Sequence, residues 1–315
     1  MTQNHPTPVP PDYVPETTDL DPFEVAPARP LWRSLPVFLL MLPFTLIGLV
    51  MVALSCIVLL PPLKKREQPS RDMRTNIISF WMLATARFRL RVTDHNPSPA
   101  DHSRLYIAPH VCMLESIILI RVVGHIRTIA SEFTRTLPLF GKVVEASDPI
   151  FVKRARAGEP NVVELMAESL DTTASRHSVF PEGTFSNGRS LLRFKNGGFM
   201  LGRPITPVIF RYPSYVPFWS RDESTFLVQI YRMVSRLYTP IDVIIFPTWH
   251  PTEAEADNPK LFADNVRRFM AWHLGVPLSK QSQRNSPNFR RDLEKLRALK
   301  ARAREQTAKE AATPG

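Results

Sequence analysis

A run of 26 residues without a charged side chain, Leu35–Leu60, most restricts how this chain can fold. As a continuous helix the run would be about 39 Å long, whereas the hydrocarbon core of a bilayer is about 30 Å thick. A soluble protein seldom buries a helix of that length that carries no charge. We therefore predict that residues 31–62 form a membrane-embedded helical segment.

The residues around and inside this run bear on how it lies in the membrane. Basic residues are more numerous after the run than before it, which favours a cytosolic position for the chain that follows. Pro43 and Gly48 lie inside the run, and a kink there would produce a re-entrant hairpin whose two ends both face the cytosol. The sequence leaves a single transmembrane span and a re-entrant hairpin as alternatives.

Both ends of the chain have the composition of tails. Residues 1–30 are rich in proline and carry scattered acidic residues, a composition that predicts a disordered tail. Residues 281–315 are strongly charged, and their few leucines predict a charged helix or tail rather than a coiled coil. The folded domain is therefore expected to occupy residues 63–280.

Apolar runs with the length of strands alternate with helix-like runs through this domain. The alternation predicts an α/β fold with a mixed central sheet and helices on both faces. An apolar stretch with basic ends, residues 76–89, suits either a helix on the bilayer surface or a core helix. The predicted strands are 87–92, 104–108, 126–130, 150–153, 178–180, 206–210 and 241–246, and the predicted helices are 113–123, 161–170, 224–237 and 261–274.

The charge and the cysteines narrow the class of partner. A net charge of +11 predicts an anionic partner. No zinc-finger, RNA-binding or helix-turn-helix pattern is present, so we expect an acidic membrane surface or a phosphorylated substrate rather than nucleic acid. Cys56 and Cys112 are the only cysteines, which implies no disulfide framework and suits a reducing compartment. No His, Cys or Asp set has metal-ligand spacing, so no metal is expected.

One loop carries many chemical groups. Residues 180–188, Phe-Pro-Glu-Gly-Thr-Phe-Ser-Asn-Gly, follow an apolar strand-like run and are rich in turn-forming residues. Loops at strand ends of an α/β scaffold are where binding groups usually lie. The groups offered in and just after the loop suit the binding of a phosphate or an alkoxide: the Glu182 carboxylate, the Gly183 N–H, the Thr184 hydroxyl, the Asn187 amide and the Lys195 amine.

A second stretch places His110 five positions before Glu115, between a strand-like run and a helix-like run. A neutral imidazole can take a proton from an attacking hydroxyl, and a carboxylate on its other nitrogen fixes the tautomer. Five positions are about 140° apart on a helix, so the two side chains can meet only if His110 lies in the turn before the helix. Pro109 favours such a break in the chain.

These two blocks, in this order and about seventy residues apart, resemble the glycerophospholipid acyltransferase family. They are most similar to its acyltransferases for lysophosphatidylcholine, lysophosphatidylethanolamine or lysophosphatidic acid. The family more often carries Asp where this chain has Glu115, and some members of the similar group carry Glu, so we treat the site as active. Further matching stretches are 194–199, 204–213, 241–247 and 258–267, and the resemblance runs from about residue 74 to residue 278.

The resemblance implies transfer of a fatty acyl group from acyl-CoA, a co-substrate rather than a bound cofactor, to the free hydroxyl of a lysophospholipid. It implies that His110 and Glu115 are the catalytic pair. It also implies that Arg154, after Phe151-Val-Lys, binds the acceptor phosphate together with the Glu-Gly-Thr loop, and that Glu182 organises Arg154 or Lys195 or contacts the acceptor hydroxyls. We expect the enzyme in the endoplasmic reticulum membrane, with the catalytic domain facing the cytosol.

Three other interpretations stay open. The first is an acyltransferase for 1-acylglycerol-3-phosphate, and the second is a transacylase that moves acyl chains between phospholipids without CoA. The third belongs to another class, a catalytically inactive membrane adaptor whose basic surface holds anionic lipid. The presence of His110, Arg154 and the 182–184 loop favours an active enzyme over the adaptor.

Overall fold

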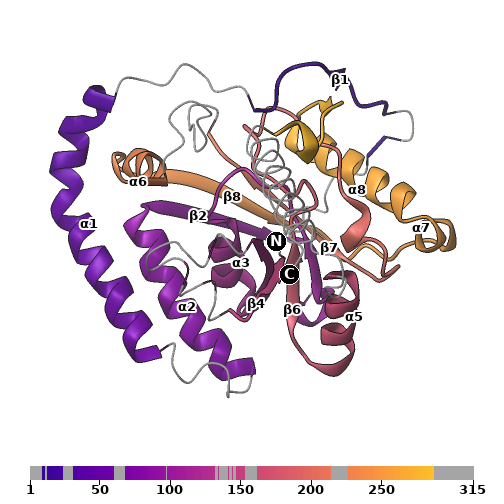
Figure 1. Ribbon diagram of the computed structural model, residues 1–315, viewed down its shortest axis with the longest axis horizontal. Coiled ribbons are helices and arrows are strands. Elements are labelled where there is room, and N and C mark those ends of the chain that lie inside the picture. Colours follow the sequence, from indigo (N-terminus) through magenta and orange to yellow (C-terminus); the bar gives the residue numbers. More distant parts are fainter. Residues whose placement is uncertain are drawn as a thin grey trace, which may run out of the picture.

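A seven-stranded sheet forms the centre of the computed structural model (Figure 1). The five strands from β7 to β5 are parallel to one another, whereas β8 is antiparallel to β7 and β2 is parallel to β8. The predicted mixed sheet is therefore confirmed. In the order in which they lie side by side, the strands are β2 (Phe88–Asp94), β8 (Thr239–Ile245), β7 (Thr206–Arg211), β3 (Leu105–Ile107), β6 (Arg176–Val179), β4 (Ile126–Ser131) and β5 (Ile150–Val152). The structure describes residues 9–10, 13–23, 31–59, 68–96, 98–131, 134, 141, 144, 147–152, 162–213 and 226–286.

The central strands are apolar because both of their faces are buried. In β7 the first five residues are buried, and Val208 and Phe210 belong to one hydrophobic core while Ile209 belongs to the other. Successive side chains of a strand point to opposite faces, so a strand between two helix layers needs apolar residues at every position. At the edge of the sheet β2 buries only Phe88, and basic, polar and apolar residues share its less buried positions.

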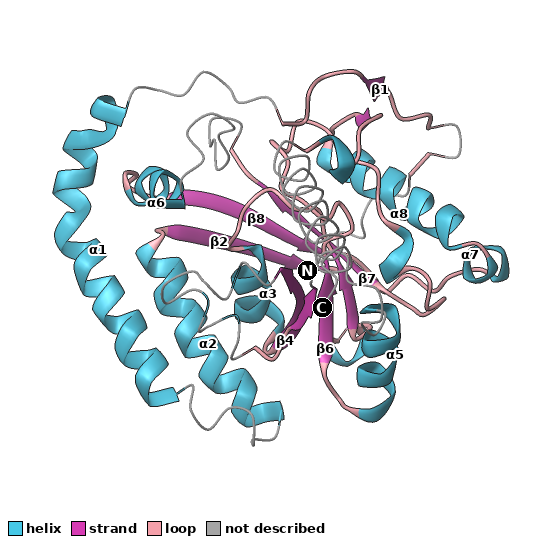
Figure 2. Ribbon diagram, in the orientation of Figure 1, coloured by secondary structure: helices cyan, strands magenta, loops and turns pink. Residues whose placement is uncertain are grey.

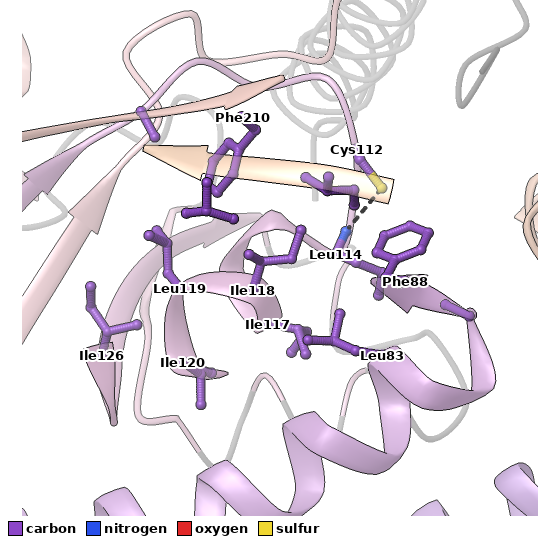
Figure 3. Close-up of a cluster of buried hydrophobic side chains, with 14 of the residues drawn as sticks. Leu83, Phe88, Cys112, Leu114, Ile117, Ile118, Leu119, Ile120, Ile126 and Phe210 are labelled. Atoms are coloured by element: carbon purple, nitrogen blue, oxygen red, sulfur yellow. Dashed lines mark hydrogen bonds between the residues drawn. The ribbon is translucent and has the colours of Figure 1, made fainter. Parts of the chain in front are cut away.

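Helices cover both faces of the sheet (Figure 2). Apolar residues of α2 and α3 form the core on one face, and residues of α5 and α8 form the core on the other. Figure 3 shows Leu83 of α2 beside Ile117 of α3 in the first of these cores. The bounds of the described helices are α2 (Gln68–Thr85), α3 (Glu115–Val123), α5 (Val162–Thr172), α6 (Phe226–Val234), α7 (Glu253–Asp257) and α8 (Pro259–Leu274).

Capping residues explain where α8 begins and ends. The Asn258 side chain accepts a hydrogen bond from the backbone N–H of Leu261 at 3.1 Å, and Pro259 occupies the first helical position, where its missing N–H costs nothing. Gly275 ends the helix with φ 69°, a left-handed conformation that favours glycine. The helix therefore starts two residues before the predicted residue 261, at the capping signal itself.

The uncharged run folds into one continuous helix, α1 (Leu31–Leu59). It passes through Pro43 and Gly48 without a break, so of the two alternatives that the sequence left open the structure favours one continuous helix over a hairpin. Its length and composition suffice to cross a membrane, and most of its apolar surface is exposed. A Cβ atom at Gly48 would collide with the Thr85 hydroxyl, so this glycine lets α1 approach α2 closely.

Hydrogen bonds hold α1 against the domain along its whole length, and α1 lies beside α2 in Figure 1. One bond lies near its start, two lie near its middle and one lies at its end. They join the Ser34 hydroxyl to the Tyr231 hydroxyl (3.1 Å), the Arg87 guanidinium to the Met41 carbonyl (2.8 Å) and the Thr45 hydroxyl (2.7 Å), and the Arg74 guanidinium to the Leu59 carbonyl (3.1 Å).

Residues 13–23, hereafter the N-terminal segment, lie against the domain rather than forming part of a disordered tail. Within it β1 (Thr17–Thr18) pairs in parallel with β9 (Leu278–Ser279), and the side chain of Phe23 is 1% exposed. The prediction of disorder for residues 1–30 is therefore wrong for this segment. Composition averages over a tail, whereas one buried aromatic side chain and one strand pairing are enough to hold a short segment in place.

The domain also extends past its predicted boundary at residue 280. The backbone N–H of Arg193 donates to the Gln281 carbonyl at 3.0 Å, and a short helical turn, η5 (Gln283–Asn285), packs against the loop that begins at residue 180. Residues 281–286 therefore belong to the folded domain and not to a charged tail. The rest of the predicted tail, residues 287–315, lies outside the described residues.

Candidate active site

His110 lies in the loop between β3 and α3, as the helical geometry requires. The strand ends at Ile107 and the helix begins at Glu115, so the chain can turn back and bring the two side chains together. Nδ1 of His110 lies 2.6 Å from Oε2 of Glu115. A carboxylate at Nδ1 holds the proton on that nitrogen and leaves the lone pair of Nε2 to act as a base.

Glu115 is fully buried, and its negative charge is compensated by several donors. Besides His110, the backbone N–H groups of Val111 and Cys112 donate to it at 3.1 Å, and the Tyr212 hydroxyl donates to Oε1 at 2.9 Å. The carboxylate also occupies the first position of α3, where the partial positive charge of a helix N-terminus favours an anion. The longer side chain of Glu thus reaches donors on both its own loop and the end of β7.

Two aromatic rings enclose the imidazole of His110. The ring of Phe180 stacks on it at 4.2 Å with an interplanar angle of 18°, and the ring of Phe185 lies at 4.2 Å with an angle of 42°. The His110 side chain is 17% exposed. The rings restrict the rotation of the imidazole and exclude water from its faces, so its edge is the part that remains for a reacting group.

Glu182 fixes the main chain around the site. Oε2 accepts from the backbone N–H of His110 at 2.7 Å, and Oε1 accepts from the backbone N–H of Leu192 at 2.9 Å. Glu182 is fully buried and joins the catalytic loop to the loop that begins at residue 180. Its predicted role towards Arg154, Lys195 or the acceptor hydroxyls stays a prediction. The sequence could not indicate the role of joining the two loops, since both partners are backbone groups distant in the chain.

A stability measurement tests this role of Glu182. Burial raises its pKa from 4.5 to about 8. The stabilisation from the protonated form is fully present below about pH 4.5 and is lost as the pH rises towards 8, because only the folded chain retains the proton in that interval. We expect Glu182→Gln to flatten the fall in melting temperature over that pH interval. It should also destabilise the fold by about 1–3 kcal/mol, because the amide leaves one buried N–H without an acceptor.

The control for this measurement is Glu168→Gln, at an exposed position of α5. Thermal unfolding of the purified proteins, followed by intrinsic fluorescence at a series of pH values, gives both quantities. A Glu182→Gln variant with the melting temperature and pH dependence of Glu168→Gln would contradict the assignment.

Gly183 and Lys195 lie against each other in the loop. Gly183 has φ +68°, and a Cβ atom built on it would lie 2.8 Å from Nζ of Lys195. The backbone conformation favours glycine at this position, and a larger residue would also displace the end of the Lys195 side chain. The Gly183 carbonyl accepts from the Gln283 amide at 2.5 Å, and the Thr184 hydroxyl lies 3.4 Å from that of Ser286. The structure thus brings Gly183, Thr184 and Lys195 together, and their contact with a substrate stays a prediction.

Asn187 holds the N-terminal segment to the site loop. Its backbone N–H donates to the Pro22 carbonyl at 2.8 Å, and its side-chain amide donates to the Asp21 carbonyl at 3.1 Å. Its side-chain oxygen accepts from the backbone N–H of Arg189 at 3.0 Å. The structure therefore gives Asn187 a positioning role, and the predicted contact with substrate stays a prediction.

Arg154 lies outside the described residues. The strand before it, β5, indicates at which edge of the sheet the chain leaves. β5 ends at Val152 and is parallel to β4, which is parallel to β6, which is parallel to β3. The carboxyl ends of parallel strands meet at one edge of a sheet, so the chain leaves β5 at the same edge as the His110 and Glu182 loops. This placement is compatible with a contact between Arg154 and a ligand of the site.

Four side chains that the sequence did not assign to the site are part of it: Phe180, Phe185, Tyr212 and Gln283. An aromatic ring or an amide carries no signal of its own partner, and these contacts join segments distant in the chain. Cys112 is near the pair but does not suit nucleophilic attack. Burial raises the pKa of its thiol well above the ordinary value, which disfavours the reactive thiolate.

Comparison with known proteins places this geometry in a family. The acyltransferase family model matches residues 89–211, which contain both the His110–Glu115 block and the Glu182 loop. Lysophosphatidylcholine acyltransferase 2 of Rattus norvegicus is 30% identical over 293 residues, covering 87% of this chain and 52% of that protein. Lysophosphatidylcholine acyltransferase 1 of Homo sapiens is 28% identical over 229 residues, covering 69% of this chain and 42% of that protein. This chain thus spans about half the length of these relatives or less.

A solved structure shows the same fold. The 1-acyl-sn-glycerophosphate acyltransferase PlsC from Thermotoga maritima superposes with a TM-score of 0.52 at 16% identity, covering 79% of this chain and 99% of that one. The family match includes both motifs, the sheet order places them at one edge, and the imidazole and carboxylate are in contact. Residues 89–211 of this chain form a domain of the acyltransferase family, and the chain is related to lysophosphatidylcholine acyltransferases.

Proposed function

We propose that this protein transfers a fatty acyl group from acyl-CoA to the free hydroxyl of a lysophospholipid. The observation that carries the proposal is the contact of 2.6 Å between Nδ1 of His110 and the Glu115 carboxylate, in a fold of acyltransferases. This arrangement leaves Nε2 free to take a proton from an alcohol. Acyl transfer to oxygen requires that step at the moment when the hydroxyl attacks.

The proposed reaction needs no covalent enzyme intermediate. Nε2 of His110 takes the proton of the lysophospholipid hydroxyl while the oxygen attacks the thioester carbonyl. Glu115 stabilises the imidazolium that forms, because its carboxylate lies on the opposite ring nitrogen. The tetrahedral intermediate then collapses, the carbon–sulfur bond breaks, and the imidazolium returns its proton to the CoA sulfur. The products are a diacyl phospholipid and free CoA.

An assay of the purified full-length protein against a panel of lysolipids tests the proposal. We expect release of one CoA thiol for each phospholipid formed, and loss of both with His110→Ala. If lysophosphatidic acid were the only lysolipid turned over, the protein would be an acyltransferase for 1-acylglycerol-3-phosphate. Acyl transfer from a diacyl phospholipid in the absence of CoA would favour the transacylase. No transfer under any of these conditions would contradict the proposal and favour the adaptor.

The phosphate of the acceptor is assigned to Arg154. A guanidinium binds phosphate through two parallel hydrogen bonds, and a hydrogen bond to a charged group contributes about 1.5–3 kcal/mol, equivalent to about 10- to 150-fold in affinity. We therefore expect Arg154→Ala to raise the lysolipid KM or lower kcat/KM on that scale, and Arg154→Lys to restore part of the loss. The exposed Arg268→Ala on α8 is the matched control. A selective rise in the KM for acyl-CoA would assign Arg154 to the donor instead.

The membrane is the proposed site of action, and α1 is the proposed anchor. Both ends of α1 are bonded to the same domain, and the Arg87 guanidinium is bonded near its middle. A transmembrane orientation would bring that guanidinium close to the bilayer centre, at a cost of about 2.5–3.5 kcal/mol. We place α1 in the leaflet next to the domain, with its exposed apolar side in lipid. The cytosolic face of the endoplasmic reticulum is the proposed location.

Two measurements test the anchor. The full-length protein should stay in membranes during an alkaline carbonate wash, because the apolar surface of α1 is held by lipid and not by charge. In a variant that lacks Cys56 and Cys112, a cysteine at Trp32 should react with a membrane-impermeant maleimide from the side of the catalytic domain. The exposed Val92→Cys on β2 marks that side. Release by carbonate contradicts embedding, and reaction of Trp32→Cys only from the opposite side contradicts the one-leaflet placement.

A further inference from the structure

Tyr212 is the residue that follows β7. Because β7 is parallel to β3, the residues that follow the two strands lie at the same edge of the sheet, where the catalytic loop begins. Its hydroxyl donates to Oε1 of Glu115 at 2.9 Å, whereas His110 contacts Oε2 at 2.6 Å. The two side chains therefore hold opposite oxygens of one carboxylate.

The origin of each donor distinguishes Tyr212 from the others. His110, Val111 and Cys112 all belong to the loop that leads into α3, so their hydrogen bonds move with the loop. Among the described residues, Tyr212 is the donor to Glu115 that comes from another element. It therefore fixes the carboxylate relative to the sheet. A glutamate has one more rotatable bond than an aspartate, and a second point of attachment removes that freedom.

We propose that Tyr212 is a positioning residue for the catalytic pair, and that it holds the Glu115 carboxylate in the plane from which it orients the imidazole of His110. This inference rests on the proposed function. Burial and the neighbouring Glu115 charge raise the pKa of Tyr212 well above its ordinary value, so the hydroxyl keeps its proton and remains a donor.

Removal of this hydroxyl should also change the ionisation of His110. Without the donor, more negative charge stays on the carboxylate, and the carboxylate then favours the imidazolium form more strongly. The acidic limb of the pH profile of kcat/KM should move to higher pH. Among the described residues, the other titratable groups that act on this site are the Cys112 thiol, next to Glu115, and the buried Glu182 carboxylate.

The test compares Tyr212→Phe with Tyr106→Phe. Tyr106 is equally a phenol with a bonded hydroxyl, 3.0 Å from Nδ1 of His102, but that contact lies away from the site. We expect Tyr212→Phe to lower kcat by about tenfold with little change in either KM, and to shift the acidic limb, whereas Tyr106→Phe should leave both unchanged. Unchanged kcat and pH profile in Tyr212→Phe would overturn the proposal. A rise in the lysolipid KM alone would also overturn it, since Tyr212 would then contact substrate.

A double-mutant cycle separates positioning from stability. The shorter carboxylate of Glu115→Asp would be about 1.5 Å farther from Tyr212, so Tyr212→Phe should cost much less in that background than in the wild type. A cost that is equal in the two backgrounds would show a general effect on the fold and overturn the proposal.

The titration of the His110 imidazole, followed by its NMR chemical shift, needs no turnover. If the wild type transferred no acyl group, the proposed function would fail. The shift of that titration in Tyr212→Phe would still decide the role of Tyr212: a higher imidazole pKa supports it, and an unchanged one overturns it.

Discussion

Replacing His110 with alanine is expected to lower turnover by about 10²–10⁴-fold while the fold remains intact. In the proposed reaction the imidazole takes the proton of the acceptor hydroxyl. Glu115 holds its Nδ1, and Phe180 and Phe185 cover its faces, so the base is kept in one orientation that the alanine variant cannot supply.

The control for this prediction is His250→Ala, at an exposed position in the loop after β8. Both variants are compared with the wild type by initial rates and by melting temperature. Turnover near that of the wild type in a folded His110→Ala protein would exclude His110 as the base.

Replacing Glu115 with glutamine is expected to lower turnover by about 10³–10⁴-fold, because an amide cannot stabilise the imidazolium. The fold should also lose about 1–3 kcal/mol. Two oxygens of Glu115 accept hydrogen bonds in the structure, whereas glutamine has one oxygen and would turn an N–H group towards buried donors. The melting temperature should therefore fall together with the rate, in contrast to His110→Ala.

The variant Glu115→Asp separates the effect of the carboxylate charge from the effect of the side-chain length. It keeps the charge and shortens the arm by about 1.5 Å, so we expect activity between that of Glu115→Gln and the wild type. Full activity of the aspartate variant would make the residue an interchangeable orienting group. Complete loss would show that the site is built for the longer side chain. A glutamine variant with wild-type turnover would contradict the role of Glu115 altogether.

The sequence predicted those parts of the molecule whose signals are local. The strands were visible because apolar residues alternate or run together, as in β7 and β8. The break between His110 and α3 followed from the angle between two positions on a helix, and the structure has the same break. The continuous helix α1 was less accessible to prediction, because proline inside a helix predicts a kink, whereas the structure has one helix that runs through Pro36 and Pro43.

The parts that could not be predicted depend on pairings between distant segments. Glu182 bonds the backbone of His110 and Leu192, and a backbone N–H has the same chemistry at every residue. The N-terminal segment was expected to be disordered because residues 1–30 are rich in proline and carry scattered acidic residues, yet Phe23 and the pairing of β1 hold it to the domain. A motif identifies which residues matter, whereas the folded chain is needed to show what each one touches.

The pairing of β1 with β9 has a consequence for how a newly made molecule becomes competent. Thr17 pairs with Leu278, so β1 can pair only after a partner 261 positions later in the chain has been synthesised. Contacts between such distant residues form late, because the intervening chain must first be ordered. Two residues of the 180–188 loop are bonded to distant parts of the chain. Asn187 is bonded to Pro22, which is synthesised early, and Gly183 is bonded to Gln283, which is synthesised late. The contacts that hold the 180–188 loop are therefore complete only after residue 283 has been synthesised, long after α1, the proposed anchor, has left the ribosome.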